Sequence, residues 1–185
     1  MKNALALFAG LASLAYSSIV RADPPVNREW AALGVGAAVP LSPGGGTGVA
    51  LSEEMGRHWL SDRGDRGFAT GLLFGESFHP SGAAGQPATE TLSIQFRALY
   101  DIGIPVGDAL LVVGPGLGAG ADILFAGGTT AAFVLTPHVD VRYLFGEEGR
   151  FFAFARVAVP LDFRSGQTES QLWVLGGAGI RFKLL

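Results

Sequence analysis

The chain lacks cysteine, carries little charge and has no long hydrophobic run after its first 22 residues. None of its 185 residues is cysteine, so disulfide bonds do not hold the fold together. Charged residues make up only 16% of the chain, and the mean hydropathy is +0.37. No segment beyond residue 22 reaches the roughly 18 consecutive apolar residues of a membrane-spanning helix. A helical membrane protein is therefore excluded, although the chain is unusually apolar for a soluble domain.

Basic clusters and metal-ligand patterns are also absent. The chain has three histidines, and its formal net charge is −3. The histidines fall on three different predicted strands, with no repeated ligand spacing. We therefore expect no nucleic-acid partner, no metal site and no cofactor.

The first 22 residues have the three parts of a secretory signal peptide. Lys2 supplies the positive start, residues 5–15 form an apolar run, and Val20-Arg21-Ala22 resembles a cleavage site. Cleavage before Asp23 would leave residues 23–185 as a single domain with a net charge of −5, because Lys2 and Arg21 are removed.

Seven of the eight apolar stretches after residue 28 alternate between an apolar residue and a small or polar one. Residues 133–145 show this most clearly, with Val139 and Tyr143 on one side and Asp140 and Arg142 on the other. A period of two belongs to a β-strand. The predicted strands are 30–41, 48–60, 67–79, 90–104, 109–125, 132–146, 150–164 and 171–184. Each is long enough to cross a bilayer at a tilt.

The connections between strands predict which residues face each other. A three-residue loop ending at Gly149 would place Asp140 opposite Arg156, between the sixth and seventh strands. A four-residue turn over 105–108 would place Arg97 opposite Gly116 and Gln95 opposite Gly118, between the fourth and fifth. Glycine in those positions would leave room for long polar side chains inside a narrow barrel.

Several residues fit the strand pattern poorly. Pro115, Pro137 and Pro160 lie inside predicted strands, where we expect bulges or nearby strand ends. Glu76 falls on the apolar face of the third strand, which indicates a bulge or the membrane edge. The second strand, with Glu53 and Glu54 side by side, has the weakest alternation.

Three features indicate that the apolar face points outward, to lipid. The other face is rich in glycine and alanine, and it carries charges of both signs. Aromatic residues gather at both ends of the apolar face, like the interfacial girdles of membrane barrels. The charged face would then form a polar network in the lumen, predicted to contain Arg97, Asp101, Asp122, His138, Asp140, Arg142, Arg156, Asp162 and Arg181.

The chain resembles the small OmpA/OmpX-type outer-membrane barrels, including the OmpW-like ones. The resemblance is carried by the eight strands, the signal peptide and the closing run Gly176-Gly177-Ala178-Gly179-Ile180-Arg181-Phe182. It implies an all-β, eight-stranded, antiparallel up-and-down transmembrane β-barrel with both termini in the periplasm. It also implies insertion by the barrel-assembly machinery. Such barrels usually end on an aromatic residue, whereas this chain ends Phe182-Lys183-Leu184-Leu185.

Ser77 and His79 share one strand face, with Glu76 and Glu90 nearby in sequence. A serine, a histidine and a carboxylate together can activate a nucleophile, and some eight-stranded barrels modify lipid A. Both side chains are predicted to face the lumen, away from a lipid substrate. We therefore expect a polar rim there and no enzyme.

These observations predict a monomeric integral protein of the outer membrane, in contact with its lipids. Side chains would fill the lumen, and the role would be structural or adaptive, with at most minor permeability to small solutes. Two alternatives remain open from the sequence. One is a soluble secreted or periplasmic calycin-like barrel that binds a small apolar ligand, and the other is a lipid A-modifying enzyme.

Overall fold

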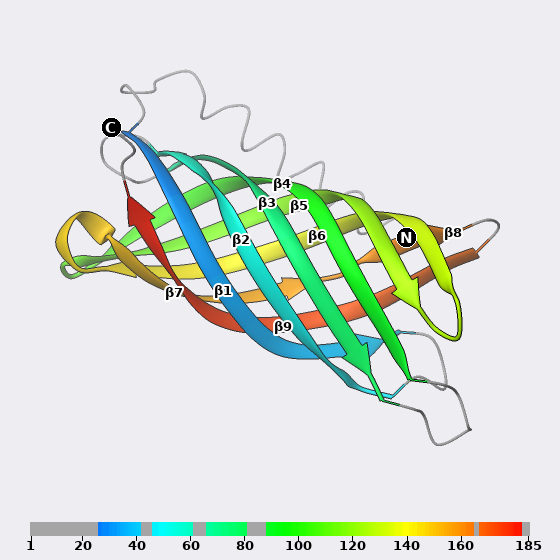
Figure 1. The fold of residues 1–185 in the computed structure, drawn as a ribbon. Coiled ribbons are helices and arrows are strands. Elements are labelled where there is room, and N and C mark those ends of the chain that lie inside the picture. The colour runs from blue at the N-terminus through cyan, green and yellow to red at the C-terminus, as the bar shows by residue number, and fades with distance from the viewer. Residues whose placement is uncertain (1–25, 42–45, 61–65, 81–87, 165–166, 183–185) are drawn as a thin grey trace.

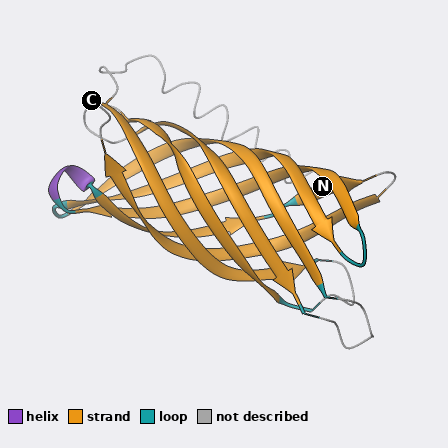
Figure 2. Cartoon of the chain, in the orientation of Figure 1, coloured by secondary structure: helices purple, strands orange, loops and turns teal. Residues whose placement is uncertain are grey.

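Long antiparallel strands make up almost all of the described chain (Figures 1 and 2). The structure is a computed structural model that describes residues 26–41, 46–60, 66–80, 88–164 and 167–182. The predicted signal peptide and residues 183–185 lie outside the described residues. The strands are β1 (Val26–Pro40), β2 (Gly48–Leu60), β3 (Arg66–His79), β4 (Thr89–Val106), β5 (Ala109–Phe125), β6 (Thr129–Phe145), β7 (Phe151–Ala158), β8 (Leu161–Arg164) and β9 (Gln167–Phe182).

The sheet closes on itself as a barrel. Consecutive strands pair from β1 to β7, both β7 and β8 pair with β9, and β1 pairs with β9 from Glu29↔Phe182 to Pro40↔Gln171. Both β7 and β8 lie between β6 and β9, so the two form one interrupted crossing. The predicted eight-stranded antiparallel barrel is therefore confirmed. Within the described part, no helix is long and apolar enough to span a membrane.

The barrel has two unlike ends. The loop end carries the connections 41–47, 80–88, 126–128 and 165–166. The terminal end carries the start of β1, the end of β9 and the turns 61–65, 107–108 and 146–150 (Figure 1). A single helical turn, η2 (Glu147–Gly149), lies in the last of these turns.

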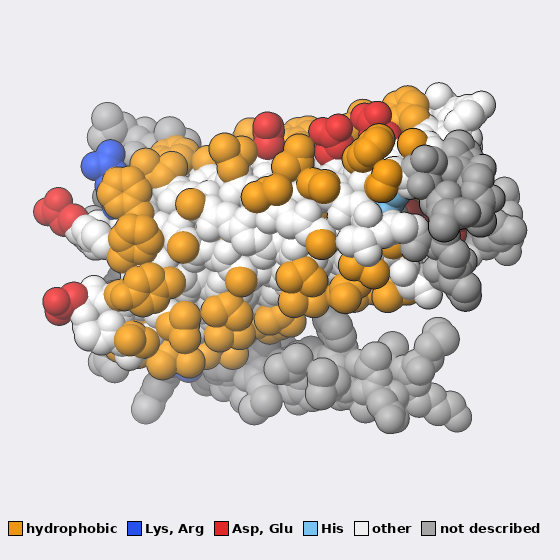
Figure 3. Space-filling model, turned by 90° about the horizontal axis from the view of Figure 1, so that it is seen from below, with side chains coloured by type: hydrophobic (Ala, Val, Ile, Leu, Met, Phe, Trp, Pro, Cys, Tyr) orange, Lys and Arg blue, Asp and Glu red, His pale blue; other side chains and the backbone are white. Residues whose placement is uncertain are grey.

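The apolar residues point outward and the charged ones inward. Phe96 and Val139 are 56% and 43% exposed, whereas Arg97 and Arg156 are 2% and 4% exposed. Hydrophobic side chains cover much of the outer wall that Figure 3 shows. This orientation confirms the predicted lipid-facing surface. It contradicts the calycin-like alternative, in which the apolar face would line the interior.

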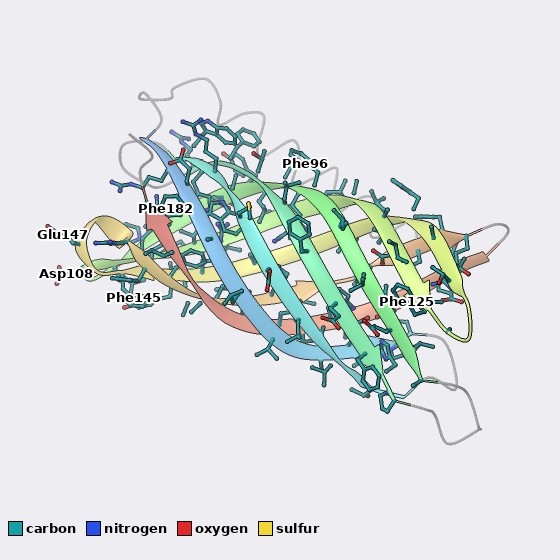
Figure 4. The ribbon with its side chains drawn as sticks, in the orientation of Figure 1. Phe96, Asp108, Phe125, Phe145, Glu147 and Phe182 are labelled. Carbon is teal, nitrogen blue, oxygen red and sulfur yellow. The ribbon has the colours of Figure 1, made fainter. Side chains whose placement is uncertain are left out.

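Two rows of aromatic side chains border the outer wall. At the terminal end, Phe68 stacks edge-on against Tyr100, and Phe145 stacks on Phe151. At the loop end, Phe133 packs against Phe163. Figure 4 labels Phe145 and Phe182 at one end of the barrel, Phe125 at the other and Phe96 between them. Both predicted girdles are therefore present.

The predicted register is confirmed between β6 and β7 and wrong between β4 and β5. Asp140 faces Arg156 as predicted. Arg97, however, faces Gly118 and Gln95 faces Gly120, a shift of two residues from the prediction. The cause is a tighter turn: Val106 pairs with Ala109, and Gly107 at φ 60° begins a two-residue connection. A shift of two keeps every side chain on its predicted face.

The prolines interrupt hydrogen bonding without inserting residues. The β6 register continues from His138↔Ala158 to Leu135↔Leu161, so the break at Pro160 contains no bulge. The Val159 N–H donates to the Pro137 carbonyl across this break, at 3.0 Å. Near Pro115, the β4–β5 register is likewise the same on both sides. The predicted bulges are therefore absent, whereas a strand end, the other predicted outcome, is found at Pro160, since β7 ends at Ala158 and β8 begins at Leu161.

Glu53 and Glu76 lie among apolar side chains of the outer wall. Pairing of β3 continues through Glu76, which faces Leu51 and Leu92, so the bulge considered there is wrong as well. Glu76 lies two residues from the aromatic Phe78, near the loop end. Glu53 is exposed farther from that end, beside a shallow hollow that Leu33, Met55 and Phe74 also line.

A charge in the middle of the outer wall should destabilise the barrel in proportion to its depth. Replacing Phe96 with arginine should lower the free energy of unfolding in lipid vesicles by about 2–4 kcal/mol. The matched change Phe125→Arg at the loop-end rim should cost about 0–1 kcal/mol. Urea titrations of the folded protein would measure both values, and equal costs would contradict the assignment of the membrane-spanning band.

Candidate functional site in the barrel lumen

Alternate residues of every strand project into the lumen, and the predicted polar residues are among them. All nine are buried: Arg97, Asp101, Asp122, His138, Asp140, Arg142, Arg156, Asp162 and Arg181. The structure divides them into separate clusters along the barrel. The cluster with the most ion pairs lies near the middle of the strands.

This central quartet consists of Glu54, Arg97, Asp140 and Arg156, from β2, β4, β6 and β7. Arg156 donates from Nε to Asp140 Oδ1 at 2.6 Å and from Nη2 to Asp140 Oδ2 at 2.8 Å. It also donates to both carboxylate oxygens of Glu54, at 3.0 Å from Nη2 to Oε2. Arg97 donates to Glu54 and, at 3.2 Å, to Asp140. Each guanidinium therefore contacts both carboxylates.

The central quartet is electrically balanced. Two cations alternate with two anions, and all four side chains are almost fully buried. Removing charges from water carries a large desolvation cost, which close ion pairs with good hydrogen-bond geometry offset. The quartet also joins four strands, including β2 and β7 on separate parts of the barrel wall.

A second cluster lies toward the terminal end. Arg142 donates to Asp101, and its Nη1 lies 2.6 Å from His58 Nε2, which accepts the hydrogen bond. The His58 ring stacks on Trp30, with ring centroids 5.6 Å apart. Arg181 donates weakly to the Gly149 carbonyl at 3.4 Å. The predicted residues Asp101, Arg142 and Arg181 are thus neighbours here, apart from the quartet.

A third cluster lies toward the loop end. Gln95 donates to the Ser93 hydroxyl at 2.7 Å, and that hydroxyl donates to Asp122. Asp122 and Asp162, on the two strands that flank β6, face the lumen close to each other. Arg164 lies 3.6 Å from Asp162 and 3.2 Å from Glu169. Acidic groups outnumber basic ones in this cluster.

Large apolar side chains occupy much of the lumen between the polar clusters. Phe152 and Phe154 pack together with centroids 6.4 Å apart, and Trp30 meets the edge of Phe152. Trp173 and Leu175 of β9 are also buried. The sequence analysis predicted a mostly small and polar interior and missed this aromatic packing.

Glycines of β5 make room for the polar side chains. A Cβ at Gly116 would lie 2.5 Å from His138 Nε2, and one at Gly118 would lie 2.4 Å from Gln95 Oε1. A real Cβ does not approach a non-bonded atom this closely, so a larger residue at either position would displace these side chains. The predicted role of glycine is right. The Gln95 side chain reaches Gly118 as predicted, although its backbone pairs with Gly120, whereas Gly116 receives His138 and not Arg97.

Sequence reasoning missed two residues of these clusters, Glu54 and His58. Both belong to β2, whose lumen face reads Ser52, Glu54, Gly56 and His58. On the outer face of the same strand, Glu53 and Arg57 obscure the alternation. A signal was available, because Glu54 and His58 keep the period of two with buried Ser52.

His138 is close to the quartet without being hydrogen-bonded to it. Its Nδ1 donates to the Thr136 carbonyl at 3.0 Å, while Nε2 has no hydrogen-bond partner within the described ranges. No set of three histidine, aspartate or glutamate side chains in those ranges is arranged to hold a metal. The arrangement around His138 is that of a packed interior.

Ser77 and His79 both face the lumen, but they do not form a catalytic pair. His79 Nδ1 lies 3.0 Å from the Gly46 carbonyl, and Nε2 lies 3.2 Å from Gln171 Oε1. Ser77 Oγ has no hydrogen-bond partner among the described residues. The geometry of an activated serine, with the hydroxyl bonded to the imidazole, is therefore missing.

The fold resembles those of solved outer-membrane barrels. Neisserial surface protein A matches with a TM-score of 0.59 and 10% identity, over 84% of this chain and 97% of the other. Ail, the attachment invasion locus protein of Yersinia pestis, matches with a TM-score of 0.50 and 14% identity, over 84% and 99%. No family model matches the chain, and no curated protein matches it.

A closed antiparallel barrel with an apolar outer wall, two aromatic girdles and a charged lumen has the features of an outer-membrane barrel. Its wall contacts lipid, because exposed apolar side chains such as Phe96, Val139 and Val157 are more stable in hydrocarbon than in water. The protein is therefore an integral β-barrel of the outer membrane.

Breaking the central quartet should destabilise the barrel strongly. Arg156→Gln would leave Glu54 and Asp140 sharing one cation, at an expected cost of about 3–5 kcal/mol in the free energy of unfolding. The control Arg57→Gln removes an exposed ion pair with Glu29 on the outer wall, and should cost less than about 1 kcal/mol.

The double variant Glu54→Gln/Arg156→Gln separates charge balance from packing. It removes one charge of each sign, so its cost should be smaller than the sum of the two single costs. Denaturant titrations in lipid vesicles would compare the wild type, Glu54→Gln, Arg156→Gln and the double variant. Simple additivity would contradict direct coupling between these two side chains.

Proposed function

We propose that the protein is a structural or adaptive component of the outer membrane, with a lumen closed by its own side chains. The observation that carries this proposal is the central quartet. Its four side chains reach inward from β2, β4, β6 and β7 and bind one another across the barrel axis.

The packing around the quartet supports closure on both sides. Trp30, Phe152 and Phe154 fill the lumen toward the terminal end, and Trp173 and Leu175 fill it toward the loop end. Eight strands enclose a space just wide enough for side chains to fill. A continuous wide pore would require these groups to leave their partners together, so we propose at most minor permeability to small solutes.

The outer wall supports a role carried out in contact with lipid. Apolar side chains cover the barrel between the girdles, and the loop-end connections are short, which leaves little surface for a large partner. We propose that residues 1–22 direct export, that the barrel-assembly machinery inserts the chain, and that the folded protein is monomeric. Among the described residues, the Ser77 hydroxyl is not hydrogen-bonded to His79, which supports a role without catalysis.

Planar-bilayer recording tests the closed lumen. Purified wild-type protein should give no large conductance steps. The variant Glu54→Ala/Arg97→Ala/Asp140→Ala/Arg156→Ala removes the quartet with no change of net charge and should conduct measurably. Heat-modifiable migration on gels would show that each protein is folded.

Arg57→Ala provides the control, because its side chain lies on the outer wall. This variant should behave like the wild type. Large, regular steps from wild-type protein, equal to those of the quartet variant, would overturn the closed lumen.

A further inference from the structure

Two buried carboxylates lie close together inside the loop end of the lumen. Asp122 comes from β5 and Asp162 from β8, the strands on either side of β6, and both side chains face the lumen, close enough to interact electrostatically. They are 2% and 1% exposed. Two ionised carboxylates this close repel each other, and the repulsion is stronger in a poorly solvated interior. A positively charged species between them would remove the repulsion.

Within the described ranges, the cations do not balance this pair. Arg164 is the basic group that acts on it among the described residues, at 3.6 Å from Asp162, and it also contacts Glu169 at 3.2 Å. One guanidinium thus serves three carboxylates. This balance differs from that of the central quartet, where charges of the two signs are equal.

Thr91 lies next to the pair on the lumen wall and has no partner of its own. It precedes Ser93, which bonds Asp122, by two residues on the lumen face of β4, and Ser77 of β3 faces Thr91 in turn. Both hydroxyls are fully buried, and neither has a hydrogen-bond partner within the described ranges. Oδ1 of Asp162 is also unpartnered there. Buried polar atoms left unpaired cost free energy, so Thr91 and Asp162 favour a ligand that would pair them.

The remaining hydrogen bonds orient one carboxylate toward such a ligand. Gln95 donates to Ser93 and Ser93 donates to Asp122, which fixes the orientation of the Asp122 carboxylate. Supporting bonds of this kind hold ligand carboxylates in place in metal sites. Carboxylate and hydroxyl oxygens are the donors that hard divalent cations prefer.

We propose that Asp122 and Asp162 bind a calcium ion in the lumen, near the loop end. Thr91, Ser77 and water molecules would supply further oxygen ligands. Calcium accepts a mixed, irregular set of oxygens, whereas magnesium demands a nearly ideal octahedron. The shortage of a third acidic or histidine ligand excludes a zinc-type site in the described residues. This binding site goes beyond the proposed structural role and does not depend on a closed lumen.

Terbium luminescence of the folded protein in detergent tests the site, because tryptophan sensitises a nearby terbium ion. The wild type should show saturable luminescence that calcium displaces, and calcium should raise its thermal unfolding midpoint. Asp122→Asn/Asp162→Asn should bind about tenfold or more weakly while remaining folded, since the substitutions also remove the repulsion. Asp108→Asn, in an exposed turn at the terminal end, is the matched control and should bind like the wild type.

Two results would overturn the proposal. The first is equal calcium binding by the wild type and the double variant, which would place the ion elsewhere. The second is that calcium leaves the thermal unfolding midpoint of the wild type unchanged, while a lower pH raises that midpoint in the wild type and not in the double variant. That result would mean that a shared proton neutralises the pair.

Discussion

The narrowness of an eight-stranded lumen is the constraint on which the rest of the structure depends. Inward-facing side chains meet one another across the axis, so any charge placed there loses most of its water. The central quartet satisfies this constraint by bringing two arginines and two carboxylates into mutual contact. Strands far apart in the sequence, β2 and β7, are thereby tied together inside the barrel.

The same constraint explains the distribution of glycine and aromatic residues. Phe154 comes so close to Gly34 and Gly177 that a Cβ at either position would lie within 2.8 Å of its ring. Large and small residues are therefore matched across the interior, and each bulky inward side chain has a glycine to receive it. On the outer wall, by contrast, side-chain size is limited only by lipid, and leucine, valine and phenylalanine predominate.

The sequence allowed the strands, their faces and the barrel to be predicted because all three follow from a period of two. Register depends on turn geometry, which is less visible: Gly107 and Asp108 alone form the turn between β4 and β5, and Arg97 therefore meets Gly118. Glu54 was missed because Glu53, beside it, lies on the outer wall and hides the alternation of β2. Contacts across the lumen, such as Glu54 with Arg156, join strands that do not pair, so no local pattern reports them.

The charges of the lumen are sorted by their distance from water. Among the described residues, the quartet in the middle is neutral. Arg142 and Arg181 share the single carboxylate Asp101 toward the terminal end, whereas acidic groups are in excess near the loop end. An unbalanced charge is most costly in the middle, where the side chains lie deepest in the barrel, and less costly near a mouth. Local neutrality in the centre thus favours the fold, while an excess of one sign is tolerated toward the ends.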